Sequence, residues 1–184
     1  MVIWIIVLVI LAGVILYAIG IYNKLVRNKN MVAEGWSGID VQLKRRSDLI
    51  PNLIETVKGY VEHEADLLSE ITKLRSRSTE ARAVADKSRI ESALTRSLGN
   101  LVALAEAYPD LKANQNFLDF QDDLSQIESE IQMARRYYNG TARNLNILIE
   151  SFPSNYIAER FRFEKAEFFE IEDVGEREVP TVKF

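Results

Sequence analysis

The chain begins with an apolar segment, residues 2–22, that contains no charged side chain. An α-helix rises about 1.5 Å per residue, so about 20 apolar residues cross the hydrocarbon core of a bilayer once. The alternative is a cleaved secretory signal, which would need a basic N-terminal region and a shorter apolar stretch of about 7–15 residues. Both are missing here, although Ala18-Ile19-Gly20 resembles a cleavage site. The segment therefore predicts a retained transmembrane anchor over residues 1–23.

The charges beside this segment predict its orientation. Lys24, Arg27 and Lys29 follow it directly, whereas its N-terminal side carries only the α-amino group. Basic residues close to a span tend to stay on the cytoplasmic side. We therefore expect a single-pass protein of the inner (cytoplasmic) membrane, with its N-terminus outside and its C-terminal domain in the cytoplasm. Residues 24–31 are a basic juxtamembrane segment, and the sequence leaves open whether they continue the helix.

Composition narrows the function of the remaining chain. About 155 residues follow the anchor, which is the size of one domain. Cys is absent and His63 is the only histidine, so thiolate or histidine-based metal centres are not expected. The net charge of −4 argues against a nucleic-acid partner. The sequence contains no phosphate-binding loop, hydrolase elbow or zinc-protease motif. We therefore predict no catalytic residue, no cofactor and no metal ligand.

Heptad patterns predict that this domain consists of long helices. The apolar a and d positions of a heptad repeat form a stripe on one face of a helix, which we call a seam. One such seam extends from about residue 32 to residue 74, and a similar seam ends at Pro153. Between them a polar stretch, residues 75–86, precedes a shorter helix that stops at Pro109 and could begin with a capping box of Ser88 and Glu91. A short helix is expected over about residues 155–163. The seam positions are Trp36, Ile39, Leu43, Ile50, Leu53, Val57, Tyr60, Leu67, Ile71 and Leu74 in the first helix, and Phe117, Phe120, Leu124, Ile127, Ile131, Ala134, Tyr138, Leu145, Leu148 and Phe152 in the last.

Helices with matching seams bury them by packing against one another. The sequence therefore predicts an all-α fold, in which the anchor precedes an antiparallel bundle of three long helices and a short C-terminal helix over residues 32–170. Pairing of the same seams between two chains is the alternative, so homo-oligomerisation stays open. Residues 171–184 are expected to form an acidic, mobile tail.

The densest cluster of charges lies within the first predicted helix. Asp40, Lys44 and Asp48 are spaced four residues apart, so they form i,i+4 pairs on one face, next to Arg45. One interpretation is a solvated, salt-bridged helix face. The functional alternative is a patch that binds anionic lipid or an acidic protein partner.

Two charged residues, Arg46 and Glu64, interrupt the first seam. On one helix they would lie about 27 Å apart, so each needs a partner from a facing helix. Such buried pairs more often fix the register of helices than catalyse a reaction. If the pair of Arg46 is only structural, Arg46→Leu should be tolerated or even stabilising. The candidate partners are Glu106, Asp110, Glu128 and Glu130 for Arg46, and Arg135 or Arg136 for Glu64.

A second candidate site is the corner between the second and third predicted helices. Pro109 is expected to stop one helix, and Asp110 and Asn114 are available to cap the next. The structural interpretation is a well-formed turn. The functional alternative is a docking surface at one end of the bundle, to which Tyr108 and Lys112 would also contribute.

Several segments of the chain together carry a family resemblance. They are Tyr22-Asn23, residues 39–46 and 48–53, residues 57–60, His63-Glu64, residues 106–114, residues 134–139 and Phe152-Pro153. In these segments the chain strongly resembles the LemA family of bacterial membrane-anchored helical proteins. The resemblance implies one N-terminal span, a cytoplasmic bundle of long helices and no established catalytic activity. Some relatives of that family look associated with the organisation of internal bacterial membranes.

Two hypotheses of function follow. The first is a non-enzymatic, membrane-anchored scaffold that recruits protein partners or self-associates. The second is a signalling or sensor adaptor that transmits helix shifts between membrane and cytoplasm. An enzyme that uses helix-borne carboxylates is a third class, which bound metal in the purified protein would support.

Overall fold

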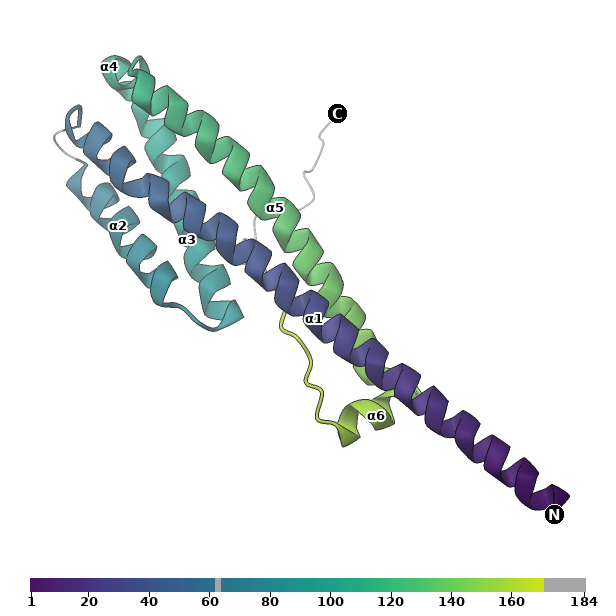
Figure 1. Ribbon diagram of the computed structural model, residues 1–184. Coiled ribbons are helices and arrows are strands. Elements are labelled where there is room, and N and C mark those ends of the chain that lie inside the picture. Colours follow the sequence, from purple (N-terminus) through teal and green to yellow (C-terminus); the bar gives the residue numbers. More distant parts are fainter. Residues whose placement is uncertain (62–63, 171–184) are drawn as a thin grey trace, which may run out of the picture. The chain divides into compact units, whose positions relative to one another are not determined.

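The computed structural model describes residues 1–61 and 64–170, and the regular elements in these ranges are all helices (Figure 1). The predicted all-α class is confirmed. The predicted acidic tail, residues 171–184, lies outside the described residues. In chain order the elements are α1 (Val2–Lys58), α2 (Ala65–Glu80), α3 (Val84–Leu104), the 3₁₀ turn η1 (Ala105–Ala107), α4 (Pro109–Lys112), α5 (Gln115–Glu150) and α6 (Ser154–Arg160).

The first helix, α1, joins the apolar segment to the rest of the chain. Its N-terminal part is long and apolar enough to cross a membrane, and none of the side chains in that part is buried inside the protein. The basic residues 24–31 lie within the same helix, so the juxtamembrane segment is helical. Pro51 also lies inside α1, where it contributes no backbone N–H.

The first predicted heptad helix is in fact two helices, so the expectation of one helix from residue 32 to residue 74 is wrong. α1 ends at Lys58 and α2 begins at Ala65. Gly59 comes directly after the last residue of α1, and glycine is among the weakest helix formers. Val57 of α1 and Ile71 of α2 nevertheless belong to the same core. This shared core explains why the heptad spacing of apolar residues continues across the break.

The connection between α2 and α3 is shorter than predicted. Only residues 81–83 lie outside the two helices, instead of residues 75–86. Arg, Lys and Glu are good helix formers, so a polar stretch does not by itself end a helix. The N-cap of α3 is Ala83, and the predicted capping box of Ser88 and Glu91 is not formed. Both of these residues are instead buried inside α3.

The chain divides into two compact units. We call residues 1–39 and 134–168 unit 1, and residues 40–133 with the described residues 169–170 unit 2. Both α1 and α5 contribute to each unit, since each helix passes a boundary between them.

Unit 2 is built around one aliphatic core. Helices α2 and α3 lie side by side in it (Figure 1), and α1, α4 and α5 add further apolar side chains. Burial of one large apolar side chain contributes about 1.5–3 kcal/mol, so a core of this size can stabilise the unit. Its fully or nearly fully buried members include Ile50, Leu53, Val57, Leu68, Ile71, Leu94, Leu98, Leu101, Leu111 and Phe117.

In unit 1, α1 and α5 approach one another closely. A Cβ atom built on Gly35 would lie only 3.0 Å from the Cα atom of Tyr138, so a larger residue at position 35 would push the two backbones apart by a few tenths of an ångström. Next to this contact the rings of Trp36 and Tyr138 lie 5.6 Å apart. Further toward the apolar segment, Leu25 is fully buried against Leu145 and α6.

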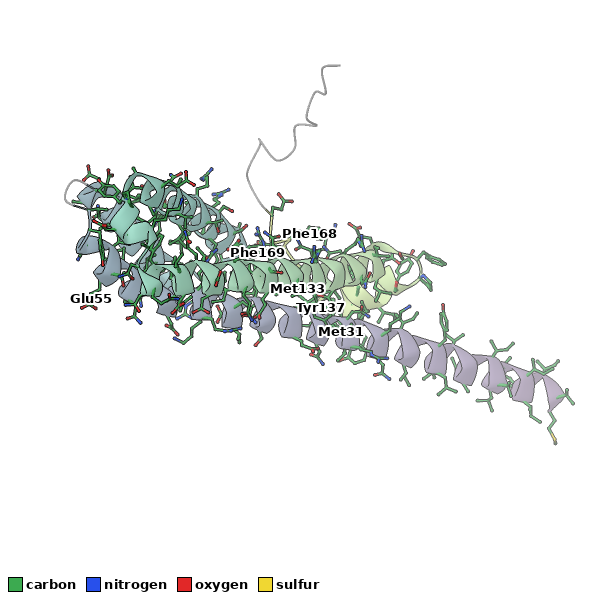
Figure 2. The ribbon with its side chains drawn as sticks, turned by 90° about the horizontal axis from the view of Figure 1, so that it is seen from above. Met31, Glu55, Met133, Tyr137, Phe168 and Phe169 are labelled. Carbon is green, nitrogen blue, oxygen red and sulfur yellow. The ribbon has the colours of Figure 1, made fainter. Side chains whose placement is uncertain are left out.

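An irregular segment, residues 161–168, follows α6 and begins with a turn at residues 161–162; we call it the strap. Two hydrogen bonds join it to Asn146 of α5, because the side chain of that residue both donates to the carbonyl of Ala166 (2.9 Å) and accepts from its N–H (2.8 Å). The hydroxyl of Tyr138 donates to the carbonyl of Glu167 at 2.8 Å. The strap ends at Phe168, which Figure 2 labels beside Phe169. These bonds hold the strap against α5.

Candidate functional sites in unit 2

The charged segment of α1 divides between the inside and the outside of unit 2. Arg46 is only 1% exposed, whereas the Lys44 and Asp48 side chains are 75% and 58% exposed and pair with each other at 3.2 Å. Arg45 is half exposed and pairs with Glu130 of α5 at 2.6 Å. Successive helix residues point about 100° apart, so adjacent basic residues can serve different surfaces.

Of the two predicted i,i+4 pairs, the structure contains the one between Lys44 and Asp48. Asp40 pairs instead with Lys87 of α3. This ion pair links two helices of unit 2, whereas Lys44 and Asp48 remain on the surface of one helix. Asp40 also stays on the surface, because its side chain is 56% exposed.

The buried guanidinium of Arg46 joins three helices of unit 2. It donates to a carboxylate oxygen of Glu128 on α5 and to the hydroxyl of Thr95 on α3, each at 2.7 Å. It also forms an ion pair with Glu91 of α3, whose other carboxylate oxygen accepts from Ser78 of α2. Glu128 was among the predicted partners of Arg46, and Glu91 was not.

This network is suited to fixing the helices rather than to chemistry. Glu91 is almost fully buried and Glu128 is partly exposed, with side-chain exposures of 5% and 29%. Removal of one partner from a buried ion pair typically costs about 3–5 kcal/mol, because the other charge is left without compensation. Within the described residues, Nε of Arg46 has no hydrogen-bond partner. The network therefore sets the register of α1 against α3 and α5.

The predicted corner contains a helix cap. The side-chain oxygen of Asn114 accepts a hydrogen bond from the N–H of Phe117 at 3.2 Å, so the prediction that Asn114 caps the next helix is confirmed. Its side-chain amide also donates to the hydroxyl of Tyr60 at 2.9 Å. This second bond connects the end of α1 to the start of α5.

The expected helix stop at Pro109 agrees with the structure, whereas the expectation for Asp110 is wrong. Helical structure continues from α3 through η1 to Ala107 and ends before Pro109, which is the first residue of the short helix α4. Proline is favoured at this position because its missing N–H would have no partner there. Asp110 lies in the first turn of α4 and does not cap α5. The side chains of Asp110 and Lys112 are exposed, and Tyr108 is half-buried.

The prediction that Glu64 is a charge on the seam of the first helix is also wrong. Glu64 lies after the end of α1 and is the N-cap residue of α2, where its side chain makes no capping hydrogen bond. It is half-buried. His63, the residue before it, lies outside the described residues.

An open groove of about 520 Å³ lies between α1 and α5 in unit 2. Glu55, labelled in Figure 2, lines it together with Asp119 and Asp123. In residues 1–61 and 64–170, no group of three His, Cys, Asp or Glu side chains is arranged to hold a metal ion. The groove is thus an acidic surface feature without a built ligand site.

Tyr138 of unit 1 is a buried titratable residue that the sequence analysis treated only as a seam position. Burial raises the pKa of its hydroxyl above the ordinary value of 10.0, and the negative charge of Glu167 raises it further. The hydroxyl therefore stays protonated at neutral pH and acts as a hydrogen-bond donor to the strap. The heptad pattern predicted that Tyr138 is buried, but it could not predict that its hydroxyl donates a hydrogen bond to the strap.

The fold defines a class of all-α proteins in which an apolar N-terminal helix continues into a helical domain. The sequence profile of the LemA family matches residues 35–184. The chain belongs to the LemA family. It is 30% identical over 166 residues to protein LemA of Metamycoplasma hominis, which covers 89% of this chain and 75% of that protein.

Two further relatives are magnetosome proteins by name. The chain is 24% identical over 186 residues to magnetosome protein MamQ 2 of Paramagnetospirillum magneticum, covering 87% of this chain and 68% of the relative. It is 23% identical over 171 residues to magnetosome protein MamQ of Magnetospirillum gryphiswaldense, covering 79% and 63%. The family assignment agrees with the resemblance seen in the sequence.

Proposed function

We propose that this protein is a non-enzymatic scaffold, anchored in the inner membrane of a bacterium, which recruits protein partners or self-associates there. The observation that carries the proposal is the continuity of α1. Its exposed apolar part is suited to a membrane, and its C-terminal part supplies core residues to unit 2. One helix thus connects a membrane segment to a domain in which ion pairs of Arg45, Arg46 and Lys87 join neighbouring helices.

The proposed orientation places the N-terminus outside and both α5 and unit 2 in the cytoplasm. The support is the basic segment of residues 24–31, since Lys and Arg beside a span favour the cytoplasmic side. A fusion of alkaline phosphatase after Phe184 tests this orientation. We expect no phosphatase activity in intact cells, and activity would show that the C-terminus is outside.

The surfaces proposed to meet protein partners are the exposed charges of unit 2. They comprise the pair of Lys44 and Asp48 on α1 and the exposed residues Asp110 and Lys112 of the corner. The names of the relatives state no reaction. Three relatives are named as magnetosome proteins, which supports a role in the organisation of a bacterial compartment rather than in catalysis.

Size measurement of the full chain in native membrane discs, combined with crosslinking in intact membranes, tests the proposed scaffold role. After the mass of lipid and polymer is subtracted, we expect a protein mass above that of one 21.0 kDa chain, and crosslinked products that contain a defined partner or a second copy. The variant Lys44→Glu with Lys112→Glu should reduce these products several-fold. Arg96→Glu, at an exposed position of α3, is the matched control. A strict monomer without crosslinked products would contradict the proposal.

A signalling adaptor is the second candidate, and it is favoured by the helical juxtamembrane segment. Because residues 24–31 belong to α1, one inserted residue would rotate everything beyond it by about 100°. Insertion of one or two residues at positions 28–30 should therefore change the pattern of partner crosslinks. Asn30→Ala, which adds no residue, is the control. An unchanged pattern after insertion would contradict the adaptor role.

A further inference from the structure

The end of unit 1 that carries α6 has three strongly exposed aromatic side chains. Phe152 is 80% exposed, Tyr156 is 63% exposed and Phe161 is 56% exposed. The rings of Phe152 and Tyr156 meet edge-to-face with their centroids 6.0 Å apart. Single exposed apolar residues are common on soluble proteins, whereas contiguous exposed apolar patches mark contact surfaces, and Phe152 and Tyr156 form such a contiguous pair. We call these three residues the aromatic cap.

Contacts within unit 1 place the aromatic cap at the end of the apolar segment of α1. The ring centroid of Phe161 lies 4.8 Å from that of Tyr22, the last residue of the apolar segment. Phe163 of the strap lies 5.9 Å from the same ring. One turn further along α1, Leu25 is fully buried in a cluster with Ala158 of α6. The cap is therefore level with the position at which the chain changes from apolar to basic.

The antiparallel course of α1 and α5 within unit 1 gives the same level for Phe152. Gly35 meets Tyr138, and Leu25 meets Leu145, so lower residue numbers on α1 correspond to higher numbers on α5. If this register is continued to the end of α5, Phe152 lies beside the last residues of the apolar segment. Phe152 and Tyr156 then lie at the same position along the axis of α1 as Tyr22, although they are far from it in the sequence.

The chemistry of the cap fits the interfacial zone of a lipid bilayer. Aromatic side chains are enriched at the level of the headgroups, and Arg or Lys side chains beside them can place their charges among lipid phosphates. Arg160 and Arg162 alternate with Phe161, and both are exposed. Continuity with the apolar segment favours lipid over a protein partner, because a helix that crosses the bilayer brings this surface to the membrane without any further component.

We propose that the aromatic cap is a second, non-spanning membrane contact, which docks into the leaflet that α1 enters. The inference rests on the proposed membrane anchor. It adds that unit 1 is seated on the bilayer by α6 and the residues around it, instead of being connected only through α1.

Depth-dependent fluorescence quenching of the full chain in phosphatidylcholine and phosphatidylglycerol vesicles with brominated acyl chains tests the proposal. The background variant is Trp4→Phe with Trp36→Phe, and Phe152→Trp adds one reporter to it. The matched control is Tyr137→Trp in the same background. Tyr137 is an exposed aromatic residue on α5 (Figure 2), and at about 1.5 Å per residue it lies about 20 Å from the end of that helix at Glu150.

A third variant, Trp36→Phe alone, keeps Trp4 as the reporter of the anchor and separates the two proposals. We expect strong bromolipid quenching for this variant and for Phe152→Trp, and several-fold weaker quenching for Tyr137→Trp. If only the variant that retains Trp4 is quenched, the anchor holds and the proposed cap contact is wrong. Iodide, a water-soluble quencher, then shows whether the Phe152→Trp reporter is exposed to water or covered by a protein partner. Either result contradicts the proposed contact of the cap with lipid. If the variant that retains Trp4 is not quenched, the membrane anchor itself is refuted.

Discussion

The two units hold their helices together by different means. Unit 2 surrounds an apolar core with residues from α1, α2, α3, η1, α4 and α5, and it contains a buried arginine whose partners come from two other helices. Unit 1 brings two helices into contact at a glycine and fastens the strap by hydrogen bonds to side chains of α5. The first arrangement depends on burial and charge compensation, and the second on close steric fit. The same kind of substitution should thus have different effects in the two units.

The largest effect is expected at Arg46. Arg46→Leu should lower the free energy of unfolding of unit 2 by about 3–5 kcal/mol, because Glu91 stays buried without its cation. This replaces the expectation from the sequence that the change is tolerated, since the burial of Glu91 could not be foreseen. Chemical denaturation of the full chain in detergent, followed by helix circular dichroism, measures the loss. Arg45→Leu is the control, because an exposed pair contributes only about 0–1 kcal/mol.

The double variant Arg46→Leu with Glu91→Leu sharpens this test. It removes both charges, and Glu128 can take up water because it is partly exposed. We expect most of the lost stability to return, since a buried pair replaced by apolar residues is often neutral or better. If the single and double variants lose equal stability, charge compensation is not what Arg46 provides.

In unit 1 the largest effect is expected at Gly35. Gly35→Ala forces a Cβ atom against the backbone of Tyr138, and such overpacking typically costs about 1–3 kcal/mol. Gly38→Ala has open space around its added methyl group, so it should stabilise α1 by about 0.5–1 kcal/mol. The fluorescence of Trp36 in a Trp4→Phe background reports the unfolding of unit 1. Changes of the same sign in both variants would contradict a close contact at Gly35.

A smaller effect is expected at the cap of α5 in unit 2. Asn114→Ala removes the bond to the N–H of Phe117 and should cost about 0.5–2 kcal/mol. Hydrogen exchange of the amides in the first turn of α5 should become faster. Asn116→Ala, within the first turn of α5, is the control and should leave these amides protected. Unchanged exchange in Asn114→Ala would show that the cap does not hold this end of α5.

The smallest effect concerns Tyr138 and depends on pH. Its pKa is higher in the folded chain than in the unfolded chain, so the unfolded state releases its proton first as pH rises. The stabilisation is complete below about pH 10 and is lost as pH rises toward the folded pKa. Tyr138→Phe should cost about 0.5–1.5 kcal/mol at neutral pH, as expected for one hydrogen bond, and the difference should shrink above pH 10. Tyr137→Phe is the exposed control. A difference that grows with pH would contradict this account.

The sequence predicted the last long helix well, because its apolar period is regular and a proline ends it. α5 ends at Glu150, close to the predicted stop at Pro153. The Asn114 cap was also predictable, since a capping side chain lies next to the residues that it serves. These features depend on neighbours in sequence, which is why they can be inferred without a structure.

The features that the sequence did not predict depend on which helices become neighbours. The heptad spacing is the same on both sides of the break after Lys58, so periodicity could not show that the chain starts a new helix. Gly59 was the only local signal. The heptad phase also placed Arg46 inside without indicating which helix faces it. The spacing of Ser88 and Glu91 predicted a capping box, whereas Glu91 in fact forms the buried ion pair with Arg46.

The central claim is that α1 places its apolar segment in the membrane and holds unit 2 at the cytoplasmic face. Because the chain has no cysteine, single cysteines at Ile10 and Lys44 can be labelled in membrane vesicles with a water-soluble maleimide. We predict that Ile10→Cys stays unlabelled until detergent is added, and that Lys44→Cys reacts in inverted vesicles but not in intact spheroplasts. Equal labelling of both positions in intact membranes, or labelling of Lys44→Cys from the outside, would contradict the account.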